Sequence, residues 1–230
     1  MNPAVPIAKL TSRAMSLGAS LVGAAPVAAL LDSPTHRLYP VDRRIREAGA
    51  VVVLALNHTP NRPEMDWWDQ RKGRTTGNRL LININRKLSE WIKTTYAVNA
   101  CELPYDALRK GIFLKDAAVL AGLGVLGKNN LLITPQYGPR VRLRALLLEA
   151  PLQSTGPLDG FAPCEGCDGP CVQACPRQAF QGGFYQRQRC LQQMKKDEAD
   201  TFIWPTPVGR TARFRIAYCR RCELSCPVGR

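Results

Sequence analysis

The hydrophobic positions in the first two thirds of the chain follow two periods. Residues 50–57 form a continuous apolar run, AVVVLALN, which is typical of a strand buried on both faces. Apolar side chains of residues 76–96 recur every three or four positions, which predicts the longest helix. Shorter patterns predict helices over 6–17 and 113–121, and strands over 19–24, 97–103, 130–134 and 141–149. We therefore expect an α/β (α+β) fold.

Other stretches carry weaker signals. The region between the strands at 19–24 and 50–57 contains Pro34 and Pro40, and we expect it to be rich in loops. The apolar run 50–57 ends at Asn57-His58-Thr59-Pro60, a strand exit of the kind where ligand-contacting residues often lie. The strand over 141–149 alternates Arg142 and Arg144 with apolar neighbours, which is typical of an antiparallel strand with one wet face.

Three aromatic or sulfur side chains need an interpretation. Trp67 and Trp68 lie in the polar stretch 61–74, where stacked tryptophans could cover a flat ligand. Packing beneath a loop is the interpretation that we favour. Cys101 lies in the strand over 97–103, and we expect a buried packing residue rather than a nucleophile.

Eight of the nine cysteines lie in the last third of the chain. They stand in the run CEGCDGPCVQACP, at a single position, and in the run CRRCELSCP: Cys164, Cys167, Cys171 and Cys175; Cys190; Cys219, Cys222 and Cys226. The bacterial ferredoxin signature for 4Fe–4S clusters is C-x2-C-x2-C-x3-C-P, and its fourth cysteine ligates the other cluster. The second run matches the last three cysteines of that signature. The first run has all four cysteines, but three residues separate its second and third cysteines where the signature has two.

The eight thiolates close two four-ligand sites with none left over. We expect one 4Fe–4S cluster on Cys164, Cys167, Cys171 and Cys226, and a second on Cys175, Cys190, Cys219 and Cys222. Disulfides would suit a short secreted chain, and zinc knuckles seldom place Cys-Pro after an x3 gap. These two alternatives stay open. Residues 160–230 are poor in long apolar runs, so the clusters would act as their core.

A glycine loop lies between the predicted helix at 113–121 and the strand at 130–134. Residues 122–130 read GLGVLGKNN, which describes a tight turn whose backbone N–H groups can approach an anion or an amide closely. The spacing is neither the dinucleotide fingerprint nor the P-loop. Glycine also serves ordinary turns, so the loop alone is a weak signal.

Composition limits the class of protein. The chain has 230 residues, 45% of them hydrophobic, which allows one ordinary core and a small cluster domain. The net charge of +14 favours an anionic partner such as RNA, a flavodoxin or a phosphate-bearing cofactor, and the alternative is a solvated basic surface. We find no run of 18 apolar residues and no signal-peptide pattern, so we expect a cytoplasmic protein without membrane contact.

The glycine loop and the two cysteine runs together resemble the epoxyqueuosine reductase family, cobalamin-dependent iron–sulfur enzymes related through their cores to reductive dehalogenases. AGLGVLGKNNLLI resembles the family's AGLGWIGKN, with Val125 where tryptophan is usual. LGASLVGAAP and EAGAVVVLALNH resemble its first two strand motifs, and QRCLQ around Cys190 resembles the segment of its lone cysteine. The resemblance covers nearly the whole chain.

The resemblance implies a nitroreductase-like, corrinoid-binding domain over 1–155 and a bacterial ferredoxin-like domain with two 4Fe–4S clusters over 156–230. Electrons would pass from reduced ferredoxin or flavodoxin through both clusters to a base-off cobalamin, since the chain has no D-x-H-x-x-G cobalt ligand. Loop residues that would face the corrin are Gly122, Gly124, Gly127, Lys128 and Asn129.

The chain departs from the family in three places. The family carries its catalytic aspartate in a D-T/S-x-P segment, and this chain has PYDALRKG there, so Asp106 or Tyr105 would serve as proton donor unless both are ordinary loop residues. The sequence ends four residues after Cys226, without the family's helical-repeat region. The first cysteine run is one residue longer than usual.

Two classes of function follow from these observations. The first is a corrinoid iron–sulfur reductase acting on an epoxide, a halide or a related electrophile. The second is an electron-transfer protein that reduces a partner corrinoid protein or enzyme and has no substrate of its own. True epoxyqueuosine reduction on tRNA is the weakest of the interpretations, because the aspartate segment and the repeat region are both absent from the sequence.

Overall fold

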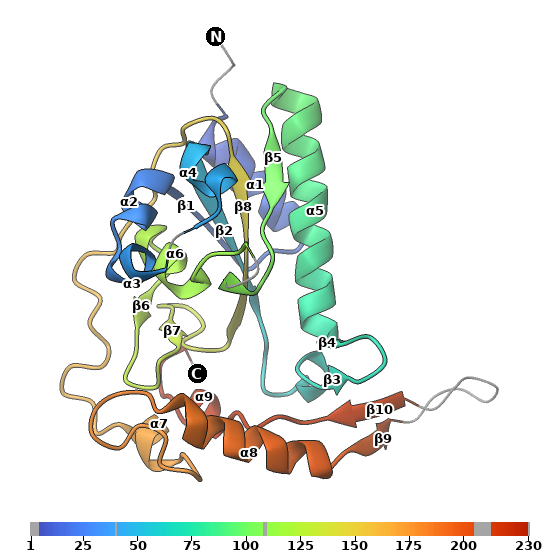
Figure 1. Cartoon of the computed structure of the whole chain (residues 1–230), viewed down its shortest axis with the longest axis vertical. Coiled ribbons are helices and arrows are strands. Elements are labelled where there is room, and N and C mark those ends of the chain that lie inside the picture. The colour runs from blue at the N-terminus through green and yellow to red at the C-terminus, as the bar shows by residue number, and fades with distance from the viewer. Residues whose placement is uncertain (1–4, 40, 108–109, 205–212, 230) are drawn as a thin grey trace. The chain divides into compact units, whose positions relative to one another are not determined.

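The computed structural model describes residues 5–39, 41–107, 110–204 and 213–229 (Figure 1). The chain divides into two compact units of mixed α/β structure, each assembled from separate segments. The first unit contains Met1–Asn57, Leu81–Val125 and Val141–Phe161, and the second contains His58–Leu80, Leu126–Arg140 and Ala162–Arg230. These units differ from a linear division at residue 155, because residues 58–80 and 126–140 pack with the cysteine-containing segment.

The first unit is built on a four-stranded antiparallel sheet in the order β1-β2-β8-β5. Its strands are β1 (Leu21–Pro26), β2 (Ala50–Asn57), β5 (Ala100–Glu102) and β8 (Val141–Leu148). The centre of the sheet is the pairing of β2 with β8, in which Val53 stands opposite Ala145. The apolar run 50–57 thus forms a central strand that is buried on both faces, as its sequence predicts.

Helices cover both faces of this sheet (Figure 1). On one face, α1 (Ile7–Ser16) and α5 (Thr76–Tyr96) bury apolar side chains against β2 and β8. The members of this core with no exposed surface include Leu10, Val52, Leu54, Leu81, Leu88, Ile92, Leu146 and Leu148. The other face is covered by α2 (Val27–Leu31), α4 (Arg43–Glu47) and α6 (Leu114–Leu120). The spacing of apolar residues predicts α1, α5 and α6 to within two residues because that spacing reports this burial.

The stretch expected to be rich in loops instead contains α2, α3 (Pro34–Leu38) and α4. The expectation is wrong because side chains cap α3 and α4, and because α2 buries Val27 and Leu30. The Ser33 hydroxyl accepts a hydrogen bond from the His36 amide, and the Asp42 carboxylate accepts one of 3.0 Å from the Arg44 amide. Single helical turns held in this way leave no periodic pattern. Pro40 lies outside the described residues.

Two further expectations for this unit are wrong. Arg144 on β8 is only 6% exposed, so the strand has no wet face: helices cover both sides of the sheet. The Arg144 guanidinium lies 4.9 Å from the centre of the Tyr105 ring. Cys101 is exposed rather than buried, since β5 is the short edge strand of the sheet.

The described residues of the second unit form a small antiparallel sheet in the order β4-β3-β10-β9, three short or medium α-helices and one 3-10 helix. Its elements are η1 (Pro63–Met65), β3 (Trp68–Asp69), β4 (Arg74–Thr75), β7 (Leu132–Ile133), α7 (Pro170–Gln173), α8 (Arg187–Ala199), β9 (Phe202–Trp204), β10 (Arg213–Ile216) and α9 (Arg221–Leu224). The strand β6 (Val125–Leu126) pairs with β7 and carries the boundary between the units.

The two neighbouring tryptophans are packing residues, as expected. The Trp67 ring centre lies 5.0 Å from that of Phe202 and 4.6 Å from that of Trp204, so β9 packs against it. Trp68 lies edge-on to Tyr218 at 6.3 Å. Of the helices in the described part of the chain, none combines the length and apolarity needed to cross a bilayer.

Candidate cysteine-based metal centre

All eight cysteines of the two runs and of position 190 lie in the second unit, and all are free thiols. Cys164 and Cys167 lie in the turn before α7, Cys171 lies within α7, and Cys175 follows it. Cys190 lies in the first turn of α8. The last three are Cys219 before α9, Cys222 within it and Cys226 after it. Three helices and the turns beside them therefore carry thiols that are separated by up to 62 residues along the chain, from Cys164 to Cys226.

The first run accommodates its additional residue at a turn. The extra position falls in the segment between Cys167 and Cys171, where Gly169 has a left-handed φ of +69°. Pro170 then occupies the first position of α7, where its missing N–H is no loss. A glycine at the turn and a proline at the helix start give this longer spacing a defined conformation.

Burial and neighbouring cysteines raise the pKa of two of the thiols, Cys171 and Cys226. Burial is the main cause that raises the pKa of Cys171, and the charges of Cys226 and Cys164 raise it further. Burial likewise raises the pKa of Cys226, and Cys164 and Cys167 add to the effect. Electrostatic influence of this kind requires proximity, so Cys164, Cys167, Cys171 and Cys226 form one group.

The other four thiols form a second group. Burial raises the pKa of Cys222 to about 12, and the charges of Cys219, Cys175 and Cys190 contribute to that rise. Cys219 is exposed, yet neighbouring groups partly desolvate its sulfur, which is the main cause that raises its pKa; Cys175 is among the further causes. Buried thiols with raised pKa values ionise only when a cation compensates the charge, so metal binding at either group would release protons.

Both groups suit a cluster in which each thiolate binds a different iron. No three His, Cys, Asp or Glu side chains among the described residues converge closely enough to hold one metal ion. In a zinc site all four sulfurs stand about 2.3 Å from one ion, whereas the ligands of a 4Fe–4S cluster are spread over its corners. The residues present therefore fit the cluster by ligand type, number and grouping.

Side chains from residues 126–140 hold the backbone of both cysteine runs. The Lys128 ammonium donates a 2.9 Å hydrogen bond to the Cys167 carbonyl. The buried Asn129 amide donates one of 3.2 Å to the Cys222 carbonyl. The Arg140 guanidinium donates to the carbonyls of Cys226 and Val228. These groups position the cysteines from outside, a role that supporting residues play at many metal sites.

The glycines of the 122–130 loop serve close backbone approaches within the chain. Gly122 has a φ of +69°, and a Cβ there would lie 2.5 Å from the Thr155 carbonyl oxygen. At Gly127 a Cβ would lie 2.6 Å from the Ile133 side chain. Gly124 is buried. Four of the five loop residues expected to face a corrin, Gly122, Gly127, Lys128 and Asn129, thus contact their own chain, and these contacts do not select a corrin.

A buried network of charges stands beside the second cysteine run, and its one signal in the sequence is the strand exit at His58. The His58 Nδ1 atom lies 2.5 Å from the Asp66 carboxylate. That carboxylate also pairs with Arg220, which pairs in turn with Glu223. Arg220 lies between Cys219 and Cys222, so the network fixes the backbone that carries both cysteines. Its members come from two distant segments, residues 58–66 and 220–223, so the pairing between them leaves no local pattern.

His58 sits at the inner end of this network with no exposed surface. Its Nε2 atom has no hydrogen-bond partner, and a Cβ at Gly77 would lie 2.4 Å from that atom. The strand exit after β2 therefore places a packing histidine inside the second unit, rather than a side chain that reaches a ligand. Gly77 is the residue that leaves room for the ring.

The two residues considered as proton donors lie in the first unit. Tyr105 is 71% exposed and faces Arg144, as described above. Asp106 is exposed, and its backbone carbonyl accepts a 3.1 Å hydrogen bond from the Gly111 amide. Neither residue shares a unit with the cysteines.

Comparison with known proteins supports the resemblance read from the motifs. Epoxyqueuosine reductases of Lactococcus garvieae and Listeria monocytogenes are 30% and 34% identical over 148 and 122 residues, which cover 63% and 51% of this chain. Tetrachloroethene reductive dehalogenase of Sulfurospirillum multivorans is 32% identical over 120 residues, or 48% of this chain. The matches span 40%, 30% and 22% of the length of those three relatives. No family model matches the chain.

Solved structures show the same fold. Epoxyqueuosine reductase from Bacillus subtilis has a TM-score of 0.66 at 20% identity, over 97% of this chain and 65% of that chain. An epoxyqueuosine reductase bound to a tRNA stem loop has a TM-score of 0.67 at 19% identity, with the same coverage. A reductive dehalogenase whose structure suggests a B12-dependent mechanism has a TM-score of 0.64 at 16% identity, over 96% and 31%. The resemblance to both kinds of protein is confirmed, and the relatives in sequence are named reductases or dehalogenases.

Proposed function

We propose that the protein is an iron–sulfur oxidoreductase whose second unit carries two 4Fe–4S clusters. Cys164, Cys167, Cys171 and Cys226 would hold one cluster. Cys175, Cys190, Cys219 and Cys222 would hold the other. The observation that carries the proposal is that all eight thiols lie in the second unit, on three helices and in the turns beside them. The clusters would supply one-electron chemistry, and a reducing, cytoplasmic compartment would suit their thiolates.

The protein's own residues would position the clusters and exclude water from them. Lys128, Asn129 and Arg140 hold the carbonyls of three of the cysteines, which fixes the direction of each thiol. The Cys175 sulfur also accepts a 3.3 Å hydrogen bond from the Ala179 amide. Hydrogen bonds to cluster sulfurs and the degree of solvent exposure set the reduction potential, so these contacts bear on function as well as on folding.

Cobalamin is our candidate for the acceptor of the electrons. The proposal rests on the similarity to a reductive dehalogenase described as B12-dependent. Gly122, Gly127, Lys128 and Asn129 make contacts within the chain, and none of these contacts selects a corrin. We therefore derive no step through the corrin and leave its site to experiment.

The second candidate function is electron transfer to a separate corrinoid protein or enzyme. It is favoured by the exposure of Cys219, which brings one ligand of the second group to the surface. The absence of an Asp-x-x-Pro segment also favours it. At the corresponding place in this sequence, Asp106 and Tyr105 lie in an exposed loop.

Iron and sulfide analysis of anaerobically purified protein tests the cluster assignment. Two clusters correspond to about eight iron and eight sulfide per chain. The variant Cys190→Ser should retain about half of both, because only the second group loses a ligand. Cys101→Ser is the matched control, since Cys101 is exposed and lies outside both groups. Retention of both clusters in Cys190→Ser, or stoichiometric zinc in place of iron, contradicts the assignment.

Hydroxocobalamin distinguishes the two candidate functions. Binding should change its visible spectrum, and the protein should retain it through a desalting column. A protein that carries both clusters but neither retains nor perturbs the corrinoid would favour electron transfer to a partner.

A further inference from the structure

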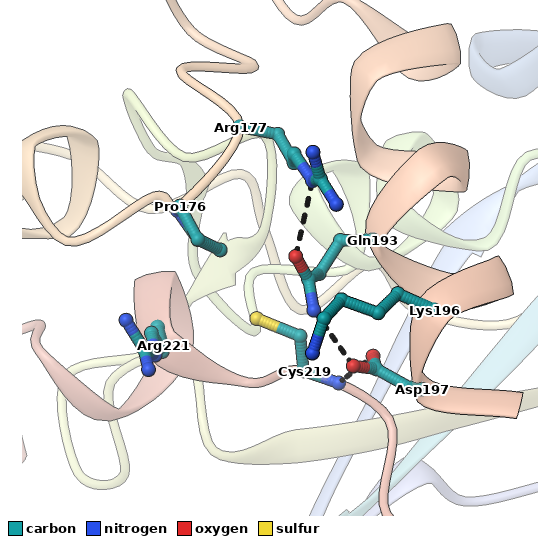
Figure 2. A pocket seen from close by; sticks show the side chains of 7 residues that line it. All are labelled: Pro176, Arg177, Gln193, Lys196, Asp197, Cys219 and Arg221. Atoms are coloured by element: carbon teal, nitrogen blue, oxygen red, sulfur yellow. Dashed lines mark hydrogen bonds between the residues drawn. The ribbon is translucent and has the colours of Figure 1, made fainter. Parts of the chain in front are cut away.

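The second group of cysteines opens to the surface at a cavity of about 450 Å³ in the second unit. Figure 2 shows the side chains that line it, and Cys219 lies among them. Of the eight cysteines of the two groups, Cys219 alone is exposed; the others are half-buried or buried. An electron that arrives from outside the protein therefore has its shortest route to the second group at this cavity.

Three cationic side chains line the same cavity: Arg177, Lys196 and Arg221. The structure describes no hydrogen bond or ion pair of the Arg221 side chain, which is exposed. Lys196 stands 3.5 Å from the Asp200 carboxylate, but both side chains are more than 60% exposed, and such a pair is weak in water. These two cations remain open to an outside partner.

The one carboxylate of the cavity is turned inward and satisfied. Asp197 is only 9% exposed, and its oxygens accept hydrogen bonds of 2.8 Å from the Cys219 amide and from the Gln193 side chain. Gln193 in turn accepts one of 3.1 Å from Arg177, and Figure 2 shows this chain of hydrogen bonds. This hydrogen-bonded chain holds the backbone of Cys219, and the charged lining side chains outside it, Lys196 and Arg221, are both cationic.

We propose that this cavity is the docking site for the acidic face of a small one-electron carrier protein of the ferredoxin or flavodoxin class. The inference rests on the proposed function, because it requires a cluster on the group that contains Cys219. The reduced carrier loses one electron and the protein gains one at that group. No bond forms or breaks, and no proton has to move.

The cavity suits a brief encounter rather than a stable complex. Complexes of electron-transfer proteins bury little surface, at the low end of the known range, and depend on charge for their speed of association. A cleft of one sign can raise association rates by about 10 to 10³ at low ionic strength. The net charge of +14 would draw an anionic partner towards the protein, and the cations at Cys219 would select where it docks.

The rate of electron delivery tests this site. Anaerobic protein with both clusters is mixed with reduced flavodoxin in a stopped-flow instrument, and the visible absorbance of the clusters is followed at low salt. Charge reversal by Lys196→Glu should slow the reduction about fivefold to tenfold, and addition of Arg221→Glu should slow it further. The difference from the unsubstituted protein should vanish at high salt, where exposed charges are screened.

The matched control is Lys195→Glu. Lys195 is the neighbouring lysine on α8, is exposed, and does not line the cavity, so the same change of net charge should leave the rate within about twofold. Reduction by an uncharged deazaflavin radical, generated by light, reports on the clusters without docking. That rate should be equal in all variants.

The outcomes separate this inference from the proposed function. Equal rates for Lys196→Glu, Lys195→Glu and unsubstituted protein, with both clusters present, would overturn the docking site alone. A protein that binds no cluster would overturn the proposed function and this inference together. If Lys196→Glu weakens retention on RNA but not reduction by flavodoxin, the cavity serves a nucleic acid and the carrier is the wrong partner.

Discussion

The two units of the chain bury different kinds of side chain. The described residues of the first unit bury a large apolar core and few polar groups: His36, Asn85, Ser89 and Arg144. The second unit buries few large apolar side chains and a longer set of polar ones: His58, Asp66, Asp69, Asn129, Thr134, Arg140, Asp197, Arg215 and Glu223. The first unit thus has an ordinary hydrophobic core, and the second unit does not.

This difference indicates what each unit needs in order to fold. Burial of apolar surface contributes roughly 25 cal/mol per Å², which suffices for a sheet covered on both faces by helices. A buried ion pair such as Asp69–Arg215 contributes little net stability, because the desolvation of both charges offsets their attraction. The second unit therefore lacks a strong source of stability in its polypeptide, and the proposed clusters would supply it.

Removal of iron should cause the largest loss of stability, and this loss should be limited to the second unit. Chelation of the full chain under anaerobic conditions should lower the hydrogen-exchange protection of α8 and β10 by roughly 10³-fold, because metal-linked folding free energy is lost. Strands β2 and β8 should keep their protection, since their core contains no cysteine of either group. Mass spectrometry of exchanged peptides measures both at once. Equal loss in the two units would show that the first unit also depends on metal.

The charge network beside the second cysteine run should be the most sensitive part of the second unit. The variant Asp66→Asn removes the carboxylate between His58 and Arg220. We expect a loss of about 3 kcal/mol, at the lower end for a broken buried pair, because Glu223 still pairs with Arg220. Iron content should fall towards one cluster per chain, since Arg220 lies between Cys219 and Cys222.

The control for this variant is Glu64→Gln. Glu64 pairs with Arg62 at 3.1 Å, and the Arg62 side chain is 64% exposed, so the change should cost less than about 1 kcal/mol and leave the iron unchanged. Chemical unfolding and iron analysis of both variants give the comparison. An equal loss of iron in the two variants would show that charge in this segment, rather than the buried network, holds the cysteine run.

The same difference between the two units explains which elements could be predicted from the sequence. The bounds of β2 and α5 follow from apolar spacing, because the first unit is organised by burial. The bounds of α3 and α4 do not, because the caps Ser33 and Asp42 hold these single helical turns. In the second unit, the cysteine spacing suggests two groups of four thiols, and iron analysis is the test of this assignment.

Contacts made by polar side chains over long sequence distances were beyond prediction. Asp66 meets Arg220 and Asp197 meets Cys219 only after the chain has folded, and neither pair leaves a local pattern. Lys128 and Asn129 were singled out by sequence for a corrin, yet each holds the backbone of a cysteine run. The motif was visible, and its contacts required the structure.

A mutation that creates a cavity in the core of the first unit should leave the proposed metal centre intact. Leu88 on α5 has no exposed surface, so Leu88→Ala should cost about 2–5 kcal/mol in the unfolding of the first unit. Leu80, on the same helix, is 42% exposed, and Leu80→Ala should cost less than about 1 kcal/mol. Unfolding followed by the far-ultraviolet circular dichroism of both variants measures these losses. Loss of iron in Leu88→Ala would show that the second unit relies on the apolar core of the first.

The smallest expected effect is a pH dependence of the stability of the first unit, and it comes from His36. Burial lowers the pKa of His36 below its usual 6.5, and the Asp116 charge opposes that shift only in part. The backbone N–H of Phe113 donates a 3.2 Å hydrogen bond to Nε2, which must therefore be unprotonated, and Nδ1 lies 2.8 Å from the Ser33 hydroxyl. The folded state thus binds fewer protons at this site than the unfolded state.

The sign follows from the lowered pKa. The stability that neutral His36 contributes is complete above pH 6.5 and is lost as the pH falls towards the lower pKa of the folded state, with a slope of at most about 1.4 kcal/mol per pH unit. In His36→Gln the slope should disappear, because a glutamine can accept from Phe113 and donate to Ser33 without titrating. The pKa of His36 is measured by nuclear magnetic resonance and the slope by unfolding at pH 5 to 7.5. A His36 pKa above 6.5 would reverse the sign, and it would mean that Asp42 and Asp116 near the ring outweigh its burial.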